Sequence, residues 1–213
     1  VRPLRGRWRI TLDEHEGSVP GRIRVKAGRG RWAELELSRI ESGRMPLRLR
    51  PTSPADVVLP PVERLKPQIE RADLSLDVDL PEDLAPILCE RERVQQVVTN
   101  VVHNAIKFTP RDGLITIRAN RTPTSFVLEF GDTGPGVPDE EGPHIFDAFF
   151  QGRREQGGQV AGTGIGLSVV RECVQAHDGT LELVNSDEFP GAHFRIEIPQ
   201  RRDVAQQKLA ANG

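Results

Sequence analysis

The sequence predicts an α+β fold, a two-layer sandwich in which one mixed sheet carries its helices on one face. Three observations lead to this fold class. A long amphipathic helix precedes two adjacent strands, a second helix precedes two more strands, and turns rich in glycine and proline separate them. Adjacent strands pair as antiparallel neighbours, and helices must cover the hydrophobic face of the sheet. With 213 residues, 37% of them hydrophobic, the chain can bury a core without disulfide bonds.

The first part of the chain gives the weakest signals. Residues 1–31 are rich in glycine and arginine, and their short alternating runs predict weak strands or no fixed structure. Apolar residues between 32 and 40 have a spacing that predicts a short helix, ended by Gly43. Three prolines between 46 and 54 then indicate a linker.

The middle of the chain is clearer. Helical spacing predicts a helix at 61–72, and alternation predicts a strand at 74–80. The strongest helix covers 91–108, and its apolar face consists of Val94, Val97, Val98, Val101, Val102 and Ala105. Strands at 114–119 and 125–130 form a hairpin.

The last part continues the same alternation of elements. A turn at 131–138 and a short apolar piece at 145–150 precede a polar, glycine-rich segment at 151–161, which we interpret as a mobile loop. A helix begins in 162–166 and ends near 176, followed by strands at 180–184 and 192–198. We expect a compact domain at 54–200 and a flexible tail at 201–213.

Charge and cysteine content exclude several classes of protein. The first 50 residues carry 13 Lys and Arg against 6 Asp and Glu, whereas the rest carry 16 against 25. The basic segment lacks a pattern for reading a nucleic-acid groove, so no nucleic-acid partner is expected. The sequence contains no run of about 18 apolar residues, so no membrane-spanning helix is expected. Cys89 and Cys173 lie in apolar surroundings and are interpreted as buried, free thiols of a cytoplasmic protein.

Four blocks of residues carry the candidate chemistry. In the first, Asn100, Asn104, Lys107 and Phe108 share one stripe of the predicted helix. An Asn carboxamide oxygen suits Mg²⁺, and a nearby Lys suits phosphate. Taken alone, the block also fits surface residues of an amphipathic helix.

The other three blocks follow along the chain. Asp132, Gly134 and Gly136 come directly after a strand, where the Asp can accept a hydrogen bond from an exocyclic amine. The apolar piece at 145–150 fits a hydrophobic plug. Glycines at 162, 164 and 166 precede a helix whose N-terminus favours phosphate. Each block alone also has a purely structural interpretation.

Together, in this order, the blocks resemble the N box, first glycine box, F box and second glycine box of the ATP-binding domain of bacterial sensor histidine kinases. That domain belongs to a superfamily shared with gyrase, Hsp90 and MutL, whose ATP-binding sandwich is called the Bergerat fold. The resemblance extends from about residue 54 to 199. The segment like an F box points to the kinases within the superfamily.

The resemblance implies MgATP as the ligand and assigns roles to individual residues. Asn104 would ligate Mg²⁺, Lys107 would contact phosphate, and Asp132 would accept from the adenine amine. Residues 151–161 would form the lid. The remaining nucleotide-binding residues implied are Asn100, Phe108, Gly134, Gly136, Gly162, Thr163, Gly164, Gly166 and Leu167.

One position separates two reaction types. ATP-hydrolysing relatives carry a Glu one turn before the metal-binding Asn, whereas this chain has Asn100 there, which cannot take a proton. The site is therefore expected to transfer phosphate to another nucleophile and to hydrolyse ATP poorly. We interpret His103 as a partly buried, hydrogen-bonded helix residue.

The phosphoacceptor is the part of the family pattern that is hardest to find. Residues 36–45 resemble the end of the second helix of a dimerisation hairpin, so 32–53 is interpreted as its remnant plus a linker. Before it, only His15 keeps part of the acceptor motif, and Gly17 and Gly21 would weaken a helix there.

The resemblance leaves two functions open. In the first, the chain is the catalytic domain of a sensor histidine kinase, and a phosphoacceptor histidine domain and a response regulator are its expected partners. Alternatively, it is a non-enzymatic ATP-binding module that regulates a partner through its lid. A serine-directed anti-sigma-type kinase fits less well, because the segment like an F box is present.

Overall fold

The structure is a computed structural model that divides the chain into two compact units, residues 1–46 and residues 47–213. In the first unit it describes the backbone of three strands, β1 (Arg9–Ile10), β2 (Arg22–Lys26) and β3 (Trp32–Glu36). In the second it describes residues 47–152, 163–186 and 188–200. The predicted tail at 201–213 and His15 lie outside the described residues.

In the first unit, one element differs from its prediction. Its three strands form an antiparallel sheet in the order β1-β2-β3. The helix predicted from 32 to 40 is wrong in its first part, because 32–36 is strand β3. Its register sets Arg22 opposite Glu36 and Arg24 opposite Glu34. Backbone pairing with β2 along all five residues favours the strand, because an isolated helix of this length is only marginally stable in water.

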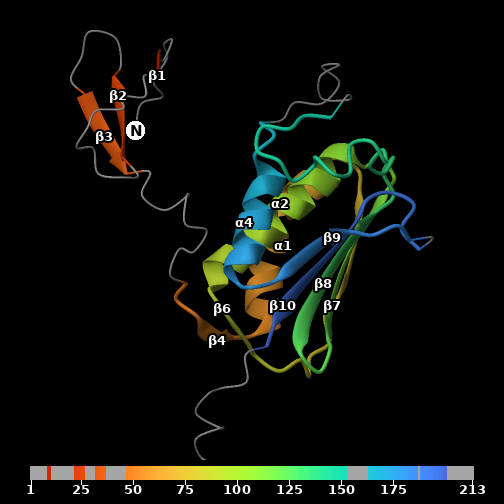
Figure 1. The fold of residues 1–213 in the computed structure, drawn as a ribbon. Helices are drawn as coiled ribbons and strands as arrows, with labels where there is room; N and C mark the ends of the chain where they lie inside the picture. The colour runs from red at the N-terminus through yellow and green to blue at the C-terminus, as the bar shows by residue number, and fades with distance from the viewer. Residues whose placement is uncertain are drawn as a thin grey trace, which may run out of the picture. The chain divides into compact units, whose positions relative to one another are not determined.

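The second unit contains the mixed sheet that the sequence predicts. Its strands run in the order β5-β7-β8-β10-β9 (Figure 1). They are β5 (Ser75–Asp79), β7 (Leu114–Arg121), β8 (Ser125–Asp132), β9 (Thr180–Leu183) and β10 (His193–Pro199). The pair β5–β7 is parallel and the other pairs are antiparallel. The predicted α+β sandwich is therefore confirmed.

Three helices lie on the same side of this sheet (Figure 1). They are α1 (Pro54–Arg71), α2 (Arg91–Phe108) and α4 (Gly166–Ala176). The bounds of α2 agree with the prediction, and its six predicted apolar residues are all buried. The hydrophobic core fills the space between helices and sheet because each helix turns its apolar stripe toward the strands.

Helix α1 begins at Pro54, not at the predicted residue 61. The Oγ atom of Ser53 caps its N-terminus by accepting a hydrogen bond from the N–H of Ala55, and proline is well suited to the first turn. Pro60, inside the helix, cannot donate to the carbonyl of Asp56. The side-chain nitrogen of Gln95 on α2 donates to that carbonyl instead, at 2.6 Å.

Two short strands lie where the sequence predicts none. Strands β4 (Arg50–Thr52) and β6 (Ile87–Cys89) pair in an antiparallel manner. Pro51, assigned to a linker, therefore lies in β4, and the second compact unit begins at Leu47. Cys89 and Cys173 are buried and free, as predicted.

The other face of the sheet carries charges in place of helices. One row crosses all five strands in register and alternates in sign, from Asp79 through Arg118, Glu129 and Arg195 to Glu182. Such a row is stable against water and needs no covering layer. It explains why the helices occupy one face only.

A buried histidine joins the ends of two helices. The Nε2 atom of His177, which follows α4, accepts a hydrogen bond from the N–H of Glu90 just before α2, at 3.1 Å. Its Nδ1 atom lies 2.7 Å from the carbonyl oxygen of Cys173. This arrangement fixes the spacing of α2 and α4. No helix in the described part of the chain is long and apolar enough to cross a membrane.

Candidate functional site

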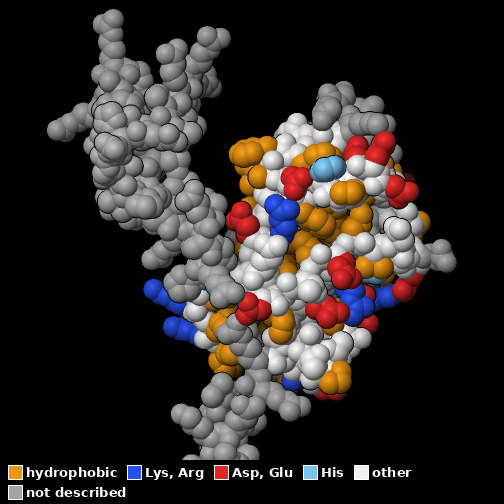
Figure 2. Space-filling model, viewed as in Figure 1, with side chains coloured by type: hydrophobic (Ala, Val, Ile, Leu, Met, Phe, Trp, Pro, Cys, Tyr) orange, Lys and Arg blue, Asp and Glu red, His pale blue; other side chains and the backbone are white. Residues whose placement is uncertain are grey.

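A cavity of about 790 Å³ opens between α2, the start of α4 and the C-terminal end of β8. On the face drawn in Figure 2, hydrophobic side chains gather between α4 and the strands, with acidic side chains around them. A volume of this size accommodates a small-molecule ligand. Ten of the twelve predicted nucleotide-binding residues line it: Asn100, Asn104, Lys107, Phe108, Asp132, Gly136, Thr163, Gly164, Gly166 and Leu167.

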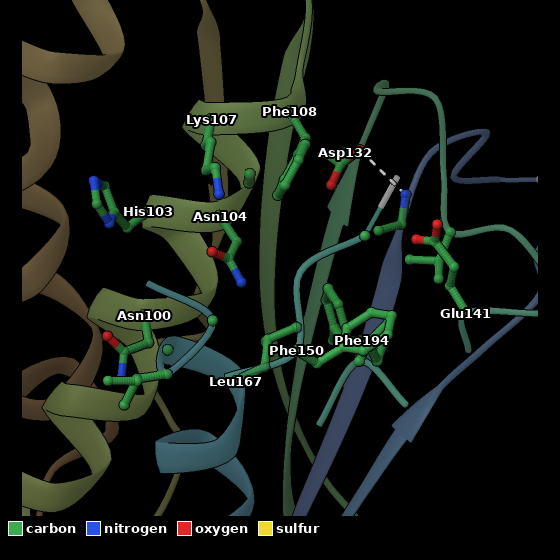
Figure 3. A pocket seen from close by; sticks show the side chains of 18 of the residues that line it. Asn100, His103, Asn104, Lys107, Phe108, Asp132, Glu141, Phe150, Leu167 and Phe194 are labelled. Atoms are coloured by element: carbon green, nitrogen blue, oxygen red, sulfur yellow. Dashed lines mark hydrogen bonds between the residues drawn. The ribbon is translucent and has the colours of Figure 1, made fainter. Parts of the chain in front are cut away.

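Helix α2 forms one wall of the cavity. Asn100, Asn104 and Lys107 lie on successive turns, and Asn104 points into the cavity (Figure 3). Burial lowers the pKa of Lys107, whose Nζ atom lies 4.6 Å from the centroid of the Phe108 ring. A partly desolvated ammonium group interacts strongly with an anion.

His103 differs from its prediction. It is exposed, although its position in the sequence predicts partial burial and a hydrogen bond. Figure 3 shows it pointing away from Asn104, although it reaches the edge of the cavity. Its helix position, one residue before Asn104, turns it by about 100° from the neighbouring side chain.

Asp132 ends β8 at the opposite wall. It is buried, and its Oδ1 atom accepts a hydrogen bond from the N–H of Gly134 at 2.8 Å. The same atom accepts a second hydrogen bond from the N–H of Ala192 at 3.1 Å (Figure 3). Both bonds go to Oδ1, so Oδ2 is the oxygen that can accept from a ligand. Burial raises the pKa of Asp132, and the two backbone hydrogen bonds partly oppose this shift.

The two glycines after Asp132 play different parts. Gly136 lines the cavity and has a φ of 69°, which favours glycine. Gly134 does not line the cavity but lies behind it. A Cβ atom there would lie 2.7 Å from Oδ1 of Asp132 and 3.2 Å from the carbonyl oxygen of Phe108. Gly134 therefore makes room for Asp132 and does not line the cavity.

The start of α4 forms a further wall of the cavity. Its cap residue Ile165 makes no side-chain hydrogen bond, so the first backbone N–H groups of the helix remain available to an anion. Gly164 has a φ of 67°, and a Cβ atom there would lie 2.5 Å from the carbonyl oxygen of Phe150. Its carbonyl accepts a hydrogen bond from Phe149 at 2.8 Å. The apolar piece at 145–150 is thus packed against the second glycine-rich turn.

Some of the predicted site lies outside the described residues. Gly162 and most of the predicted lid, residues 153–161, belong to this part. The cavity is also lined by residues that were not predicted as site residues, including Glu141, Phe150, Ala192 and Phe194. Phe150 belongs to the apolar piece at 145–150, which was interpreted as a hydrophobic plug. Phe194 lies in β10 and Ala192 directly before it, and no sequence motif marks either residue as part of a site.

The arrangement fits a magnesium ion bound together with a polyphosphate. A Cβ atom on Gly166 would lie 4.0 Å from Oδ1 of Asn104, so this carboxamide oxygen faces the first residue of α4. Mg²⁺ prefers oxygen ligands and commonly takes only one or two from protein, with phosphates and waters supplying the others. Asn104 can be such a ligand.

Comparison with known proteins gives a consistent result. The family described as histidine kinase-, DNA gyrase B- and HSP90-like ATPase matches residues 89–202. The chain is 34% identical over 139 residues to the adaptive-response sensory kinase SasA of Gloeothece citriformis. That match covers 65% of this chain and 35% of the relative, so this chain spans only part of the length of such kinases.

Solved structures give the same answer for the fold. The mycobacterial sensor histidine kinase MprB is similar with a TM-score of 0.60 at 26% identity, covering 72% of this chain and 98% of that one. Full-length ShkA in complex with AMPPNP is similar with a TM-score of 0.64 at 26% identity, covering 73% of this chain and 32% of that one.

Proposed function

This chain belongs to the family of histidine kinase-, DNA gyrase B- and HSP90-like ATPases, and it is homologous to the catalytic domains of sensor histidine kinases. We therefore propose that it binds MgATP in the cavity and transfers the γ-phosphoryl group to a histidine of a two-component phosphorelay. One observation carries the proposal. A buried carboxylate and an uncapped helix N-terminus lie on different walls of one cavity, with a carboxamide oxygen facing the helix.

The carboxylate end suits adenine. Oδ2 of Asp132 would accept from the exocyclic amine, while Oδ1 is held by two backbone N–H groups. Phe108, Phe150 and Phe194 line the cavity and offer apolar surface to a purine. Gly136 lets the ring approach the backbone.

The other end suits the triphosphate. Backbone N–H groups at the start of α4 and the ammonium group of Lys107 would bind phosphate oxygens. Mg²⁺, held by Asn104, would neutralise the charge that builds up on the transferring group. Phosphoryl transfer requires mainly positioning and charge stabilisation, which these residues provide.

Asn100 decides the reaction type. Of the described residues that line the cavity, Asp132 and Glu141 carry carboxylates, and in Figure 3 both lie across the cavity from Asn100. A water molecule near the phosphates would therefore lack a carboxylate base on α2. The site is built to hold ATP for another nucleophile.

That nucleophile and the later acceptor belong to partners of the domain. We propose a phosphoacceptor histidine on a helical hairpin and a response regulator as these partners, in the cytoplasm. His15, which keeps only part of the acceptor motif, is a weak candidate for this histidine and lies outside the described residues. The alternative of a non-enzymatic ATP-binding module is not favoured, because the named relatives are kinases.

The test is incorporation of label from [γ-³²P]ATP. The chain is incubated alone, with a separate histidine-containing hairpin domain of a sensor kinase, and with the same hairpin carrying Ala at its acceptor histidine. Acid-labile label on the hairpin that requires its histidine supports transfer. Nucleotide binding without any transfer would contradict the proposed kinase activity.

A further inference from the structure

The segment that enters β10 holds Asp132 from behind. The N–H of Gly191 donates to the backbone oxygen of Asp132 at 3.0 Å, and the N–H of Ala192 donates to its Oδ1 atom at 3.1 Å. A Cβ atom on Gly191 would lie 2.1 Å from the same Oδ1. The position of residues 191 and 192 therefore fixes the direction in which the carboxylate points.

Phe189 anchors this segment on the other face of the sheet. Its side chain is buried, although that face also carries the row of alternating charges described above. A Cβ atom on Gly131 would lie 2.1–2.5 Å from three atoms of the Phe189 ring, so the ring lies directly against the backbone beside Asp132. Only glycine leaves room for this contact.

Two further side chains hold the ring in place. The His193 ring lies 4.6 Å from it, centroid to centroid, at an interplanar angle of 60°. The Arg118 guanidinium lies 5.2 Å from its centroid and forms an ion pair with Glu188, the residue before Phe189. The ring is thus fixed from β7, β8 and β10.

We propose that Phe189 is a positioning residue for nucleobase selection: by packing on Gly131 it fixes residues 191 and 192, and through them the aim of the Asp132 carboxylate. The inference rests on the proposed function. Adenine presents an amine where guanine presents a carbonyl oxygen, which a fixed carboxylate oxygen repels. If the carboxylate moves, it can avoid that oxygen or reach another donor of guanine, and discrimination falls.

The test compares AMPPNP with its guanine counterpart GMPPNP, both with Mg²⁺, by calorimetric titration of the full chain. Removal of the ring in Phe189→Ala is expected to lower the ratio of the two affinities about tenfold or more, because discrimination by a buried polar group depends on its placement. Most of the change should be weaker AMPPNP binding. Phe189→Tyr, which retains the ring, should keep the wild-type ratio.

Val127→Ala is the matched control. Val127 is buried on the same face of β8, four residues before Gly131, and its truncation also removes apolar contact there. The ratio of the two affinities should stay at its wild-type value in this variant. The comparison therefore separates a general loss of stability from a change in the orientation of the Asp132 carboxylate. If Phe189→Ala does not fold, Phe189→Leu retains apolar volume without the flat ring and should still lower the ratio.

The outcomes separate the two proposals. An unchanged ratio in a folded Phe189→Ala or Phe189→Leu protein overturns the positioning role while leaving the ATP site intact. An equal fall in Val127→Ala also overturns it. Absence of AMPPNP binding to the folded wild-type chain overturns the proposed function itself, and the positioning role with it.

Discussion

The side-chain oxygen of Asn104 faces Gly166, the first residue of α4, at a distance of 4.0 Å from the position of a Cβ atom there. The two residues lie 62 positions apart in sequence and on different helices. This arrangement places the oxygen proposed as a Mg²⁺ ligand next to the first backbone N–H groups of α4, which are proposed to bind phosphate. Both are required if a magnesium ion and a triphosphate are bound side by side.

Asn104→Ala should remove most of the gain in nucleotide affinity that Mg²⁺ provides. The variant lacks the carboxamide oxygen proposed as the protein ligand of the ion, while Asp132 still binds the base. Titration with AMPPNP in Mg²⁺ and in EDTA measures this difference. His103→Ala is the control, since His103 is the neighbouring residue and points away from Asn104. An undiminished Mg²⁺ effect in Asn104→Ala would exclude this role.

Asp132→Asn should weaken ATP binding by roughly 1–3 kcal/mol, about 5- to 150-fold in Kd. The amide oxygen of Asn can still accept from Gly134 and Ala192, but the cavity then meets an NH₂ donor where adenine also donates. Asp79→Asn, a carboxylate of the outer charged row, should bind ATP as the wild type does. Equal affinity of Asp132→Asn and the wild type would show that the base does not contact this carboxylate.

Asp132→Asn, which should weaken nucleotide binding, is not expected to destabilise the nucleotide-free protein at neutral pH. Burial raises the pKa of Asp132 above its ordinary value of 3.8, so the folded state favours the neutral acid. Its contribution to stability is present below pH 3.8 and is lost as the pH rises through the folded pKa. At pH 7 the nucleotide-free Asp132→Asn protein should therefore be at least as stable as the wild type in thermal unfolding. A clear loss of Tm at pH 7 would contradict this.

Asn100→Glu should increase ATP hydrolysis by at least about tenfold, because a carboxylate base at this position can activate water. The wild type and Asn100→Ala should both hydrolyse slowly. Gln96→Glu adds the same side chain one turn earlier on α2 and is the matched control. Steady-state phosphate release measures all four proteins. Fast hydrolysis by the wild type that Asn100→Ala leaves unchanged would show that water is activated elsewhere.

His193 should make the fold sensitive to acid. Its ring is buried, and within the described residues neither ring nitrogen has a hydrogen-bond partner. Burial lowers its pKa below 6.5, while the carboxylates of Glu129 and Glu188 oppose this shift. A histidine whose folded pKa is lowered contributes stability above pH 6.5, which is lost as the pH falls through the folded pKa.

The measurement is the free energy of unfolding of the wild type and His193→Leu between pH 8 and pH 5. The wild type should lose stability relative to the variant below pH 6.5, with a slope of at most about 1.4 kcal/mol per pH unit. His103→Leu, at an exposed position of α2, should follow the wild type. Parallel curves for the wild type and His193→Leu would contradict the role of His193.

Elements with a local signal were predicted from the sequence. The valines of α2 repeat at helical spacing and are buried, and the strands on either side of the 122–124 turn alternate clearly. Elements that depend on a distant partner were not. Strand β3 has an apolar spacing that also suits a helix, and its pairing with β2 decides its structure. Strand β4 is three residues long and depends on β6.

The candidate site shows the same division. Asn104 and Asp132 belong to motifs whose order along the chain is itself the signal, and the cavity brings them together. Gly134 has the same motif evidence but lies behind Asp132, because the turn geometry cannot be derived from spacing alone. Phe189 had no local signal at all, since its contact with Gly131 forms only when β10 pairs with β8.

Calorimetric titration of the folded 213-residue chain with MgATP tests the central claim most directly. The account predicts saturable binding of one nucleotide per chain, which is lost or strongly weakened in Asp132→Asn. Absence of binding heat at several temperatures, with circular dichroism showing a folded protein, would contradict the assignment of this cavity as the ATP site.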